Sequence, residues 1–405
     1  INDDAIVEAA ETFTATIGPI TASDPQVTLG APVSANLLIA DDDTATVAIA
    51  AGTNGSEPGP SNVTFTVTQS AVASVDTVIP VTYGGGAASG VDYTAGPATV
   101  TVLAGTTGPV TITLPVIDDL VVEGTETLTA TLGAPTSGLA TLGAALASRD
   151  IADDDTATVS IALSAGGDGA EPGADDGEFT VTMSAMSATP TTVSYTLGAG
   201  TATSATDFAA LPGSVIIPAN SLTAVIAVDV LDDAIVEGGE TVIVNLTATT
   251  SNALITAAGN ATNTITDNDT STVSIANTTN GTEAGPADGT MTVTLTNQSS
   301  TATTVSYTLG AGTATSGTDF TALPLTVVIP ALTSSATITI PVLQDTIVEG
   351  GETVIVNLTA ATSNALITAA GNATNTITDN DTGTLTIDDV TIGEAGGNAT
   401  FTVTL

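Results

Sequence analysis

The stretch Asp232–Leu246, DDAIVEGGETVIVNL, combines the two patterns that decide the fold of this chain. Its first part places four acidic residues around a Gly-Gly pair, which is typical of a loop. Its second part, TVIVNL, alternates apolar and polar residues with period two, which is typical of a strand with one buried face. The turn Asp267-Asn268-Asp269-Thr270 then closes the segment. The stretch therefore predicts a strand bounded by acidic loops.

The acidic pattern recurs at an interval the size of a domain. Its closing aspartates are Asp43, Asp155, Asp269 and Asp381, which are 112, 114 and 112 residues apart. A period of that length corresponds to a whole domain and not to one rung of a solenoid. Altogether 32 of the 43 acidic residues occupy repeated positions. Scattered surface charge does not explain this placement.

The repeats predict the domain organisation. We expect the C-terminal part of a repeat at 1–43, complete repeats at 44–155, 156–269 and 270–381, and the N-terminal part of another at 382–405. The two end pieces together lack counterparts of residues 184–229, so we expect the chain to be a window on a longer array. Ile235–Thr270 and Ile347–Thr382 differ at one position, which indicates recent duplication.

Short β-branched runs fill each repeat between clusters of Gly, Pro, Asn and Asp. In the repeat 156–269 they lie at 157–162, 179–183, 192–196, 214–217, 223–230 and 241–246. This pattern predicts an all-β fold of antiparallel sandwiches with about seven strands each. No segment has the 3.6-residue apolar period of a helix. Trp is absent and aromatic residues make up 2% of the chain, so the cores must consist mainly of aliphatic residues and Thr.

The charge balance restricts the partners. The chain has 43 acidic residues against one basic residue, Arg149, and has no His or Cys. Protein cations therefore cannot neutralise the carboxylates, and an external cation must do so. Nucleic acid is excluded as a partner because phosphate binding requires Lys and Arg, and anionic membranes would repel the chain. The lack of Cys excludes disulfides and thiolate sites. No stretch is typical of a membrane span or a signal peptide.

Acidic groups that converge without protein cations predict a metal site. At an effective dielectric constant of about 20, each close carboxylate pair repels by several kcal/mol. Ca²⁺ fits such a set because it takes about 6–8 oxygen ligands in flexible geometry. Zinc and copper are disfavoured by the lack of His and Cys, and Mg²⁺ by its demand for strict octahedral geometry.

Four ordered motifs resemble those of the Calx-β family. They are the Glu-Pro/Ala-Gly loop, the Asp-aromatic pair, the Asp-Asp-x-x-Val-Glu-Gly-x-Glu run and the closing Asp-x-Asp-Thr. The resemblance covers the whole chain. It implies tandem immunoglobulin-like sandwiches, arranged as an elongated array, with several Ca²⁺ ions in loops at one end of each domain.

The resemblance also implies a ligand set, position by position. Up to the end of the repeat 44–155, the implied metal ligands are Asp3, Asp4, Glu8, Asp41, Asp42, Asp43, Glu57, Asp92, Asp118, Asp119, Glu123, Asp153, Asp154 and Asp155. In the rest of the chain they are Glu171, Asp207, Asp232, Asp233, Glu237, Asp267, Asp269, Glu283, Asp319, Asp345, Glu349, Asp379, Asp381 and Glu394.

Some repeated positions have more than one interpretation. Glu126, Glu240 and Glu352 could be ligands or plain strand-end residues. The aromatic residues Tyr93, Phe208 and Phe320 are expected to fill the core. Amides replace acids at Asn268, Gln344 and Asn380, so we expect weaker or fewer ions in the two later complete repeats.

The function expected from these features is structural. We expect a calcium-binding array of an extracellular or cell-surface protein that forms a rod or filament stiffened by Ca²⁺. Its partners would be neighbouring copies of itself or a ligand on a cell surface or in a matrix. The alternatives are the stalk of a calcium-dependent adhesin, a calcium-sensor module, or an acidic surface of a salt-adapted protein without metal. Catalysis is not expected, because nucleophile–base pairs built on Cys or His are absent.

Overall fold

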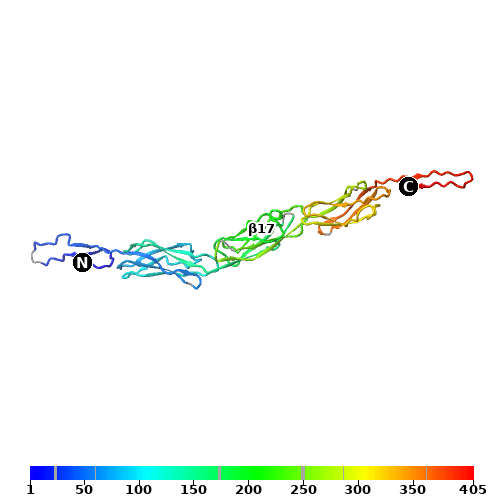
Figure 1. The fold of residues 1–405 in the computed structure, drawn as a ribbon. Helices are drawn as coiled ribbons and strands as arrows, with labels where there is room; N and C mark the ends of the chain where they lie inside the picture. The colour runs from blue at the N-terminus through cyan, green and yellow to red at the C-terminus, as the bar shows by residue number, and fades with distance from the viewer. Residues whose placement is uncertain (22–24, 60, 172–174, 248–250, 286, 362) are drawn as a thin grey trace.

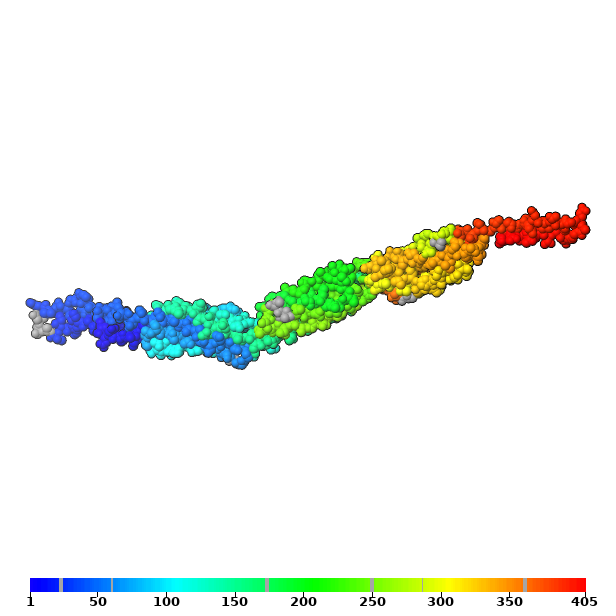
Figure 2. Space-filling view, in the orientation of Figure 1, coloured from blue at the N-terminus to red at the C-terminus, as the bar shows by residue number. Residues whose placement is uncertain are grey.

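The computed structural model describes residues 1–405 except 22–24, 60, 172–174, 248–250, 286 and 362. Three β-sandwiches follow one another along an elongated molecule, and a two-stranded hairpin extends from each end (Figure 1). Figure 2 shows the same succession of lobes with their side chains filled in. Every element assigned in the described residues is a strand, which confirms the all-β prediction. The described residues contain no helix of the length and apolarity needed to cross a membrane.

The first sandwich packs a sheet in the order β10-β3-β5-β8 against a sheet in the order β4-β11-β9-β6-β7. The strands of the smaller sheet are β3 (Thr46–Ala51), β5 (Val63–Gln69), β8 (Val110–Leu114) and β10 (Thr141–Leu142). Those of the larger sheet are β4 (Gly55–Ser56), β6 (Thr77–Gly85), β7 (Thr99–Val102), β9 (Glu126–Leu132) and β11 (Leu146–Ala152).

The middle sandwich has the same plan, with sheets in the orders β17-β14-β12-β19 and β13-β20-β18-β15-β16. The strands of its smaller sheet are β12 (Ala157–Leu163), β14 (Gly177–Met183), β17 (Thr223–Val228) and β19 (Ile255–Ala257). Those of its larger sheet are β13 (Gly169–Ala170), β15 (Thr191–Leu197), β16 (Ser214–Ile217), β18 (Glu240–Leu246) and β20 (Asn260–Thr266).

The last sandwich repeats the plan once more, with sheets in the orders β26-β23-β21-β28 and β22-β29-β27-β24-β25. The strands of its smaller sheet are β21 (Ser271–Thr279), β23 (Gly289–Leu295), β26 (Ser335–Ile340) and β28 (Ile367–Ala369). Those of its larger sheet are β22 (Gly281–Thr282), β24 (Thr303–Leu309), β25 (Thr326–Ile329), β27 (Glu352–Ala361) and β29 (Asn372–Thr378).

Within the described residues, each sandwich thus has two short strands beyond the seven expected. In the middle sandwich these are β13 and β19, and both pair parallel to their neighbours, β20 and β12. Strands of two or three residues are too short to show a period-two pattern, so the sequence did not reveal them. The other pairings within this sandwich are antiparallel, as predicted.

The two end pieces form hairpins that extend away from the sandwiches (Figure 1). Strand β1 (Glu11–Thr16) pairs antiparallel with β2 (Ser34–Ile39), and β30 (Thr386–Ile387) pairs antiparallel with β31 (Val403–Thr404). In both hairpins the strand residues are exposed, except for the half-buried Ile39.

The sandwich cores follow from strand alternation. In β14 the side chains of Phe179, Val181 and Met183 are buried, while those of the residues between them face outward. Burying a side chain of this size contributes about 1.5–3 kcal/mol. A slip of one residue would turn the apolar set to solvent, so the pattern also fixes the register. The aromatic residues Tyr93 and Phe208 lie in the cores as well, which confirms the prediction for them.

Each core also contains one valine from the acidic run before it. Val7 belongs to the core of the first sandwich, Val122 to that of the middle sandwich, and Val236 to that of the last. Each of these valines precedes the glutamate of its run directly in the sequence. Neighbouring sandwiches are therefore joined by an apolar contact as well as by the chain.

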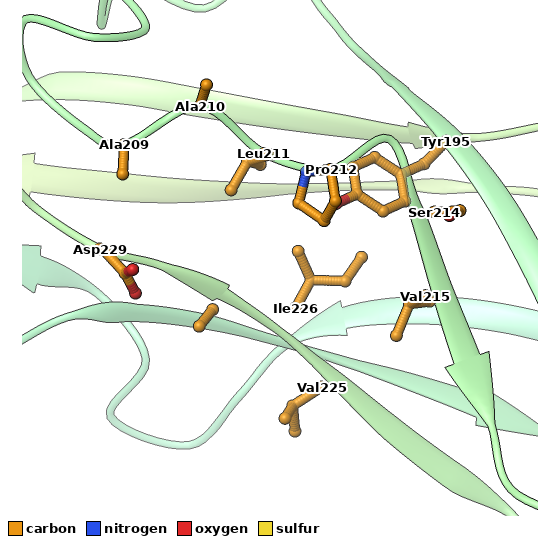
Figure 3. A pocket seen from close by; sticks show the side chains of 11 residues that line it. Tyr195, Ala209, Ala210, Leu211, Pro212, Ser214, Val215, Val225, Ile226 and Asp229 are labelled. Carbon is orange, nitrogen blue, oxygen red and sulfur yellow. The ribbon is translucent and has the colours of Figure 1, made fainter.

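A hollow of about 240 Å³ lies beside β16 and β17 in the middle sandwich. Tyr195, Pro212 and Ile226 line it, and the carboxylate of Asp229 stands at one edge (Figure 3). Most of the described lining residues are apolar. A ligand pocket usually combines an apolar lining with several convergent polar groups. This hollow does not have that combination and is part of the packing between the two sheets.

Candidate metal centre

Acidic side chains gather at the junctions between the sandwiches. In the first sandwich three groups have carboxylate oxygens within 4.8 Å of one another. We call them the inner group (Glu57, Asp153, Asp155), the outer group (Glu57, Asp118, Asp154) and the third group (Asp92, Glu123, Glu126). Glu57 belongs to both the inner and the outer group, so one buried carboxylate links two clusters.

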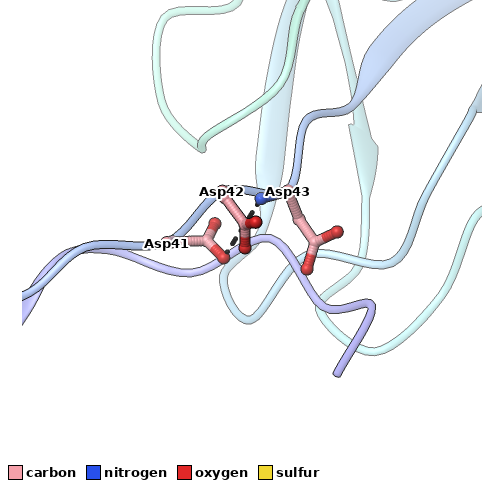
Figure 4. Close-up of side chains that lie close together, drawn as sticks. All are labelled: Asp41, Asp42 and Asp43. Atoms are coloured by element: carbon pink, nitrogen blue, oxygen red, sulfur yellow. Dashed lines mark hydrogen bonds between the residues drawn. The ribbon is translucent and has the colours of Figure 1, made fainter. Parts of the chain in front are cut away.

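The same arrangement appears at other junctions. Glu171, Asp267 and Asp269 form the inner group of the middle sandwich. Asp41, Asp42 and Asp43 lie close together where the first hairpin meets the first sandwich (Figure 4). This last cluster shares a pocket of about 130 Å³ with Asp3, Asp4 and Glu8.

Pairing of short strands brings the loop glutamate to the closing aspartates. Strand β4 runs parallel to the end of β11, where Ser56 is opposite Ala152. The Glu57 N–H continues this pairing by donating to the Ala152 carbonyl at 3.1 Å. Glu57 therefore stands beside Asp153, the residue that follows Ala152. The equivalent bonds join Glu171 to Thr266 and Glu283 to Thr378, both at 3.0 Å.

The first closing aspartate organises the turn through backbone N–H groups. Asp153 accepts one hydrogen bond from the Glu123 N–H and one from the Asp155 N–H, both at 2.8 Å. Asp267 accepts from Glu237 and Asp269 in the same way, both at 2.7 Å. The equivalent aspartates Asp379 and Asp41 make the same pair of bonds. This aspartate therefore ties the acidic run to the closing turn at each junction.

The acidic run is shaped by a local turn. The Asp119 carboxylate accepts from the Val121 N–H at 2.6 Å, two residues further on. Asp4, Asp233 and Asp345 make the equivalent bond. Side chains of Asp commonly form such turns with the following backbone. The turn directs the next residues of the run toward the following sandwich.

The third group is built around a buried aspartate. Asp92 is 5% exposed, and its carboxylate accepts from the Ala88 N–H within its own loop. Its carbonyl accepts from the Ile117 N–H at 3.0 Å, which fixes the loop beside the start of the acidic run. The neighbouring Tyr93 is in the core and bridges to Val116. The aromatic side chain thus anchors the aspartate next to Glu123, the second member of the group.

Burial, together with the neighbouring negative charges, raises the pKa values of several of these carboxylates. Burial raises the pKa of Glu57 to about 7, and the negative charges of Asp153 and Asp119 add to the shift. Burial also raises the pKa values of Glu123 and Glu126 to about 7, with Asp92 as the next cause in both cases. In the middle sandwich, burial and a hydrogen bond with Asp207 raise the pKa of Glu240 to about 8. Without a cation, the protein holds these acids in a state that favours the proton.

Several carboxylate oxygens in these groups are buried and have no hydrogen-bond partner in the described structure. In the first sandwich they include Glu57 Oε2 and Asp155 Oδ2. A buried oxygen without a partner is costly. A hard cation with oxygen ligands satisfies such atoms, so the residues present fit Ca²⁺. The counterparts in the other sandwiches behave alike: Glu171 Oε2, Asp269 Oδ2, Glu283 Oε2 and Asp381 Oδ2.

The outer group differs between the sandwiches. In the last sandwich Gln344 and Asn380 occupy the positions that Asp118 and Asp154 have in the first. The Gln344 Nε2–H donates to Asn380 Oδ1 at 3.1 Å. These two amides therefore satisfy each other where the first sandwich has two carboxylates.

The family model of the Calx-beta domain matches residues 1–43, 57–162, 173–269 and 267–381. These matches cover most of the chain. The chain belongs to the Calx-beta family. Calx-beta domains are non-catalytic and typically bind calcium. The boundaries predicted above, including the part-repeat at 382–405, stay predictions.

Solved structures similar to this Calx-beta chain include two of Calx domains and one of titin. The crystal structure of calcium-binding domain CBD12 of CALX1.1 is 16% identical, with a TM-score of 0.24, and the match covers 54% of this chain and 99% of that chain. The crystal structure of the apo-form Calx CBD1 domain is 22% identical, with a TM-score of 0.25, and the match covers 28% of this chain and 100% of that chain. The I-band fragment I67–I69 from titin is 12% identical, with a TM-score of 0.25, covering 83% and 97%. No curated protein sequence matches the chain.

The structure brings most of the predicted ligands of this Calx-beta array together. Beyond the groups above, the negative charges that raise the pKa of Glu237, after burial, come from Asp207, Asp233 and Asp267. Those that raise the pKa of Glu349, again after burial, come from Asp319, Asp345 and Asp379. Asp232 contributes in the same way at Asp269. Glu394 is different, because it lies exposed in the C-terminal hairpin and is in none of the groups named here.

One residue outside the predicted ligand set belongs to a cluster. Glu126 begins β9, and its carboxylate lies with those of Asp92 and Glu123. The sequence left open whether it was a ligand or a strand-end residue, and it starts a strand while facing the cluster. The signal in the sequence that could have indicated this position was its spacing, three residues after Glu123. After burial, the equivalents of Asp92 raise the pKa values of the equivalent glutamates: Asp207 acts on Glu240 and Asp319 on Glu352.

Proposed function

We propose that this chain binds several Ca²⁺ ions per complete domain and that the bound ions stabilise and stiffen the array. Buried, unpartnered carboxylate oxygens at the junctions, such as Glu57 Oε2 and Asp155 Oδ2, are the main support. With one Arg and no Lys or His in the chain, protein cations cannot satisfy them. A divalent cation supplies the missing positive charge.

The acidic residues of a domain have different roles in ion binding. In the first sandwich the inner, outer and third groups each offer three carboxylates to an ion. Asp153 also fixes the backbone of the site, because its oxygens accept from Glu123 and Asp155. Glu57 supplies a charge that two ions share. Exposed members such as Asp118 leave room for water to complete the coordination of Ca²⁺.

Stabilisation follows from linkage. Ions that bind the folded loops and not the unfolded chain add RT ln(1 + [L]/Kd) to the free energy of unfolding, which is about 2.7 kcal/mol at a hundredfold excess over Kd. Extracellular calcium modules commonly have Kd values of about 10⁻⁴–10⁻³ M. We place the protein outside the cell or on its surface, where millimolar calcium keeps weak sites filled.

The proposed role of the array is mechanical. Its elongated shape, repeated domains and short junctions suit a rod or filament (Figure 1). Such a rod would associate with neighbouring copies of itself or with a ligand on a cell surface or in a matrix. The near absence of basic residues disfavours nucleic acid as a partner.

Calorimetry of matched variants tests calcium binding. We expect CaCl₂ to raise the melting temperature of the chain and a chelator to lower it. Glu171→Gln removes one charge from an inner group and should reduce the number of ions bound or their affinity. Glu178→Gln removes the same charge from β14 of the same sandwich. It should change neither the number of ions bound nor their affinity. An unchanged melting temperature in excess chelator would disprove the proposal.

A further inference from the structure

The acidic run at each complete junction inserts one residue into the next sandwich. Val236 is fully buried and forms a parallel bridge with Ser299 of the last sandwich. Its N–H donates to the Gln298 carbonyl at 2.8 Å, and its carbonyl accepts from the Ser300 N–H at 3.1 Å. The backbone of this valine is therefore held on both sides by the following domain, and its side chain completes that domain's core.

The residue after the valine belongs to the acidic cluster of the preceding domain. The Glu237 N–H donates to Asp267 Oδ2 at 2.7 Å. Two consecutive residues thus connect the core of one domain to the acidic cluster of another.

The first two junctions have the same valine contacts. The Val122 N–H donates to the Met186 carbonyl, and the Val122 carbonyl accepts from the Ala188 N–H. Val7 makes the same backbone hydrogen bonds with Val72 and Ser74. Both valines are buried in the core that follows them.

The fourth repeated valine, Val348, has no sandwich after it in the described chain. It has the same neighbours in the sequence as Val236 but is 52% exposed. In the described chain Val348 is followed by the β30–β31 hairpin and not by a sandwich, so it is a copy of the motif without a core to receive it.

We propose that the inserted valine couples each acidic cluster to the folding of the domain after it. When the following domain opens, Gln298 and Ser300 release the backbone of Val236, and Glu237 loses the constraint that places it against Asp267. The coupling is reciprocal, since a free energy shared by two sites acts equally on both. An ordered cluster presents the valine in the position that the next core requires. The effect on calcium rests on the proposed function, but the coupling itself does not.

Hydrogen–deuterium exchange of the full chain in chelator tests the coupling without calcium. We compare Val236→Ala with Val348→Ala, the same substitution in the same local sequence. Val236→Ala leaves a cavity in the following core. It should raise exchange about tenfold, equivalent to about 1.4 kcal/mol, both around 298–300 and at the Glu237 amide. Val348→Ala should change neither segment.

A second measurement follows protection of the closing turn at 267–269 as CaCl₂ is added. We take the calcium concentration at which half of this protection is gained. It should be at least a fewfold higher in Val236→Ala than in the unaltered chain, and unchanged in Val348→Ala. If Val236→Ala unfolds the last sandwich, Val236→Thr, which keeps the branched shape, replaces it.

The two measurements separate the coupling from the proposed function. Faster exchange confined to 298–300 would overturn the coupling, because the valine would then be only a core residue. Absence of any calcium effect in the unaltered chain would instead refute the proposed function, while the result in chelator would still decide the coupling.

Discussion

Asp153 and Asp155 are two residues apart and have different surroundings. Asp153 accepts two backbone N–H groups, whereas Asp155 Oδ2 is buried without a partner in the described structure. In the last sandwich the corresponding N–H donors, first Asp381 and then Glu349, lower the pKa of Asp379. The first closing aspartate therefore shapes the turn through the two backbone N–H groups that it accepts. The second is available for a cation, so an Asp-x-Asp motif combines structure and binding.

The glutamates of these clusters predict how stability depends on pH. Glu57, Glu123 and Glu126 have an ordinary pKa of 4.5, which rises to about 7 in the folded protein. Between these values the folded state binds more protons than the unfolded chain, so the free energy of unfolding falls as pH rises. In chelator, calorimetry should show a falling melting temperature from about pH 4.5 to about pH 7.

Calcium should reduce this pH dependence. A bound ion holds the carboxylates ionised and competes with protons for the same oxygens. Melting curves recorded over the same pH range with excess CaCl₂ are the matched comparison. A melting temperature that rises with pH in chelator would contradict the assigned pKa shifts, because it would mean that the unfolded chain binds more protons.

The outer group of the last sandwich predicts a gain of binding. Gln344→Asp together with Asn380→Asp replaces two hydrogen-bonded amides by the acids that the first sandwich has at these positions. We expect about one more Ca²⁺ per chain by titration calorimetry, because three carboxylates would again face one another. In chelator the same variant should melt earlier through charge repulsion.

Asn398→Asp is the control for that variant. It adds a carboxylate to the exposed C-terminal hairpin and should leave the number of ions unchanged. The same number of bound ions in the control and in the double variant would show that the acidic outer group does not bind.

Short strands place the acidic loops at the ends of the sandwiches. The parallel pairing of β4 with β11 carries Glu57 to Asp153, and β13 with β20 does the same for Glu171. Neither β4 nor β13 is long enough to be stable alone. Each depends on the sandwich that it joins, so the geometry of a cluster is only as rigid as the sheet behind it.

The bridge between Phe208 and Val230 holds the Asp-aromatic pair of the middle sandwich against its core. Phe208 is 1% exposed and follows Asp207 directly. Phe208→Ala should lower the stability of the middle sandwich by about 3–5 kcal/mol, as for other buried aromatic residues. It should also weaken calcium binding, since Asp207 loses its anchor. Denaturant unfolding followed by hydrogen exchange in this sandwich measures the first effect, and calcium titration the second.

Phe401→Ala is the matched control for Phe208→Ala. Phe401 is 57% exposed, and its loss should change stability by less than about 0.5 kcal/mol. Equal effects of the two substitutions would contradict the core position of Phe208.

The long strands were predictable from the sequence because their alternation is local. The runs expected at 214–217 and 241–246 correspond to β16 (Ser214–Ile217) and β18 (Glu240–Leu246). The period of the acids also predicted that the loop glutamate, the run and the closing turn would converge. The short parallel pairing that joins Glu57 to Asp153 was not predictable, since two-residue strands have no pattern. The insertion of Val236 was hidden for another reason: a single valine in a loop does not indicate which core receives it.

Two connections span each complete junction of the whole molecule. The chain itself passes from Ala152 at the end of β11 to Ala157 at the start of β12, without a Gly/Ser-rich or Pro-rich linker. The buried Val122 is the second connection. Two connections resist bending better than one, and the acidic cluster lies between them. The joint that limits motion is therefore also the place where charge accumulates.

This arrangement predicts that calcium controls the stiffness of the array. In chelator, repulsion among carboxylates such as Asp118, Asp119 and Asp154 pushes the connections at a junction apart, so the angles between sandwiches should vary more. Small-angle X-ray scattering should then show a broader and shorter distance distribution than in CaCl₂, and electron micrographs should show bent particles in place of straight ones. MgCl₂ at equal concentration is the control, because it screens surface charge equally but demands octahedral geometry. Equal stiffening by both salts would mean that screening alone straightens the chain. Identical scattering in chelator and in CaCl₂ would show that calcium does not affect the stiffness of the array.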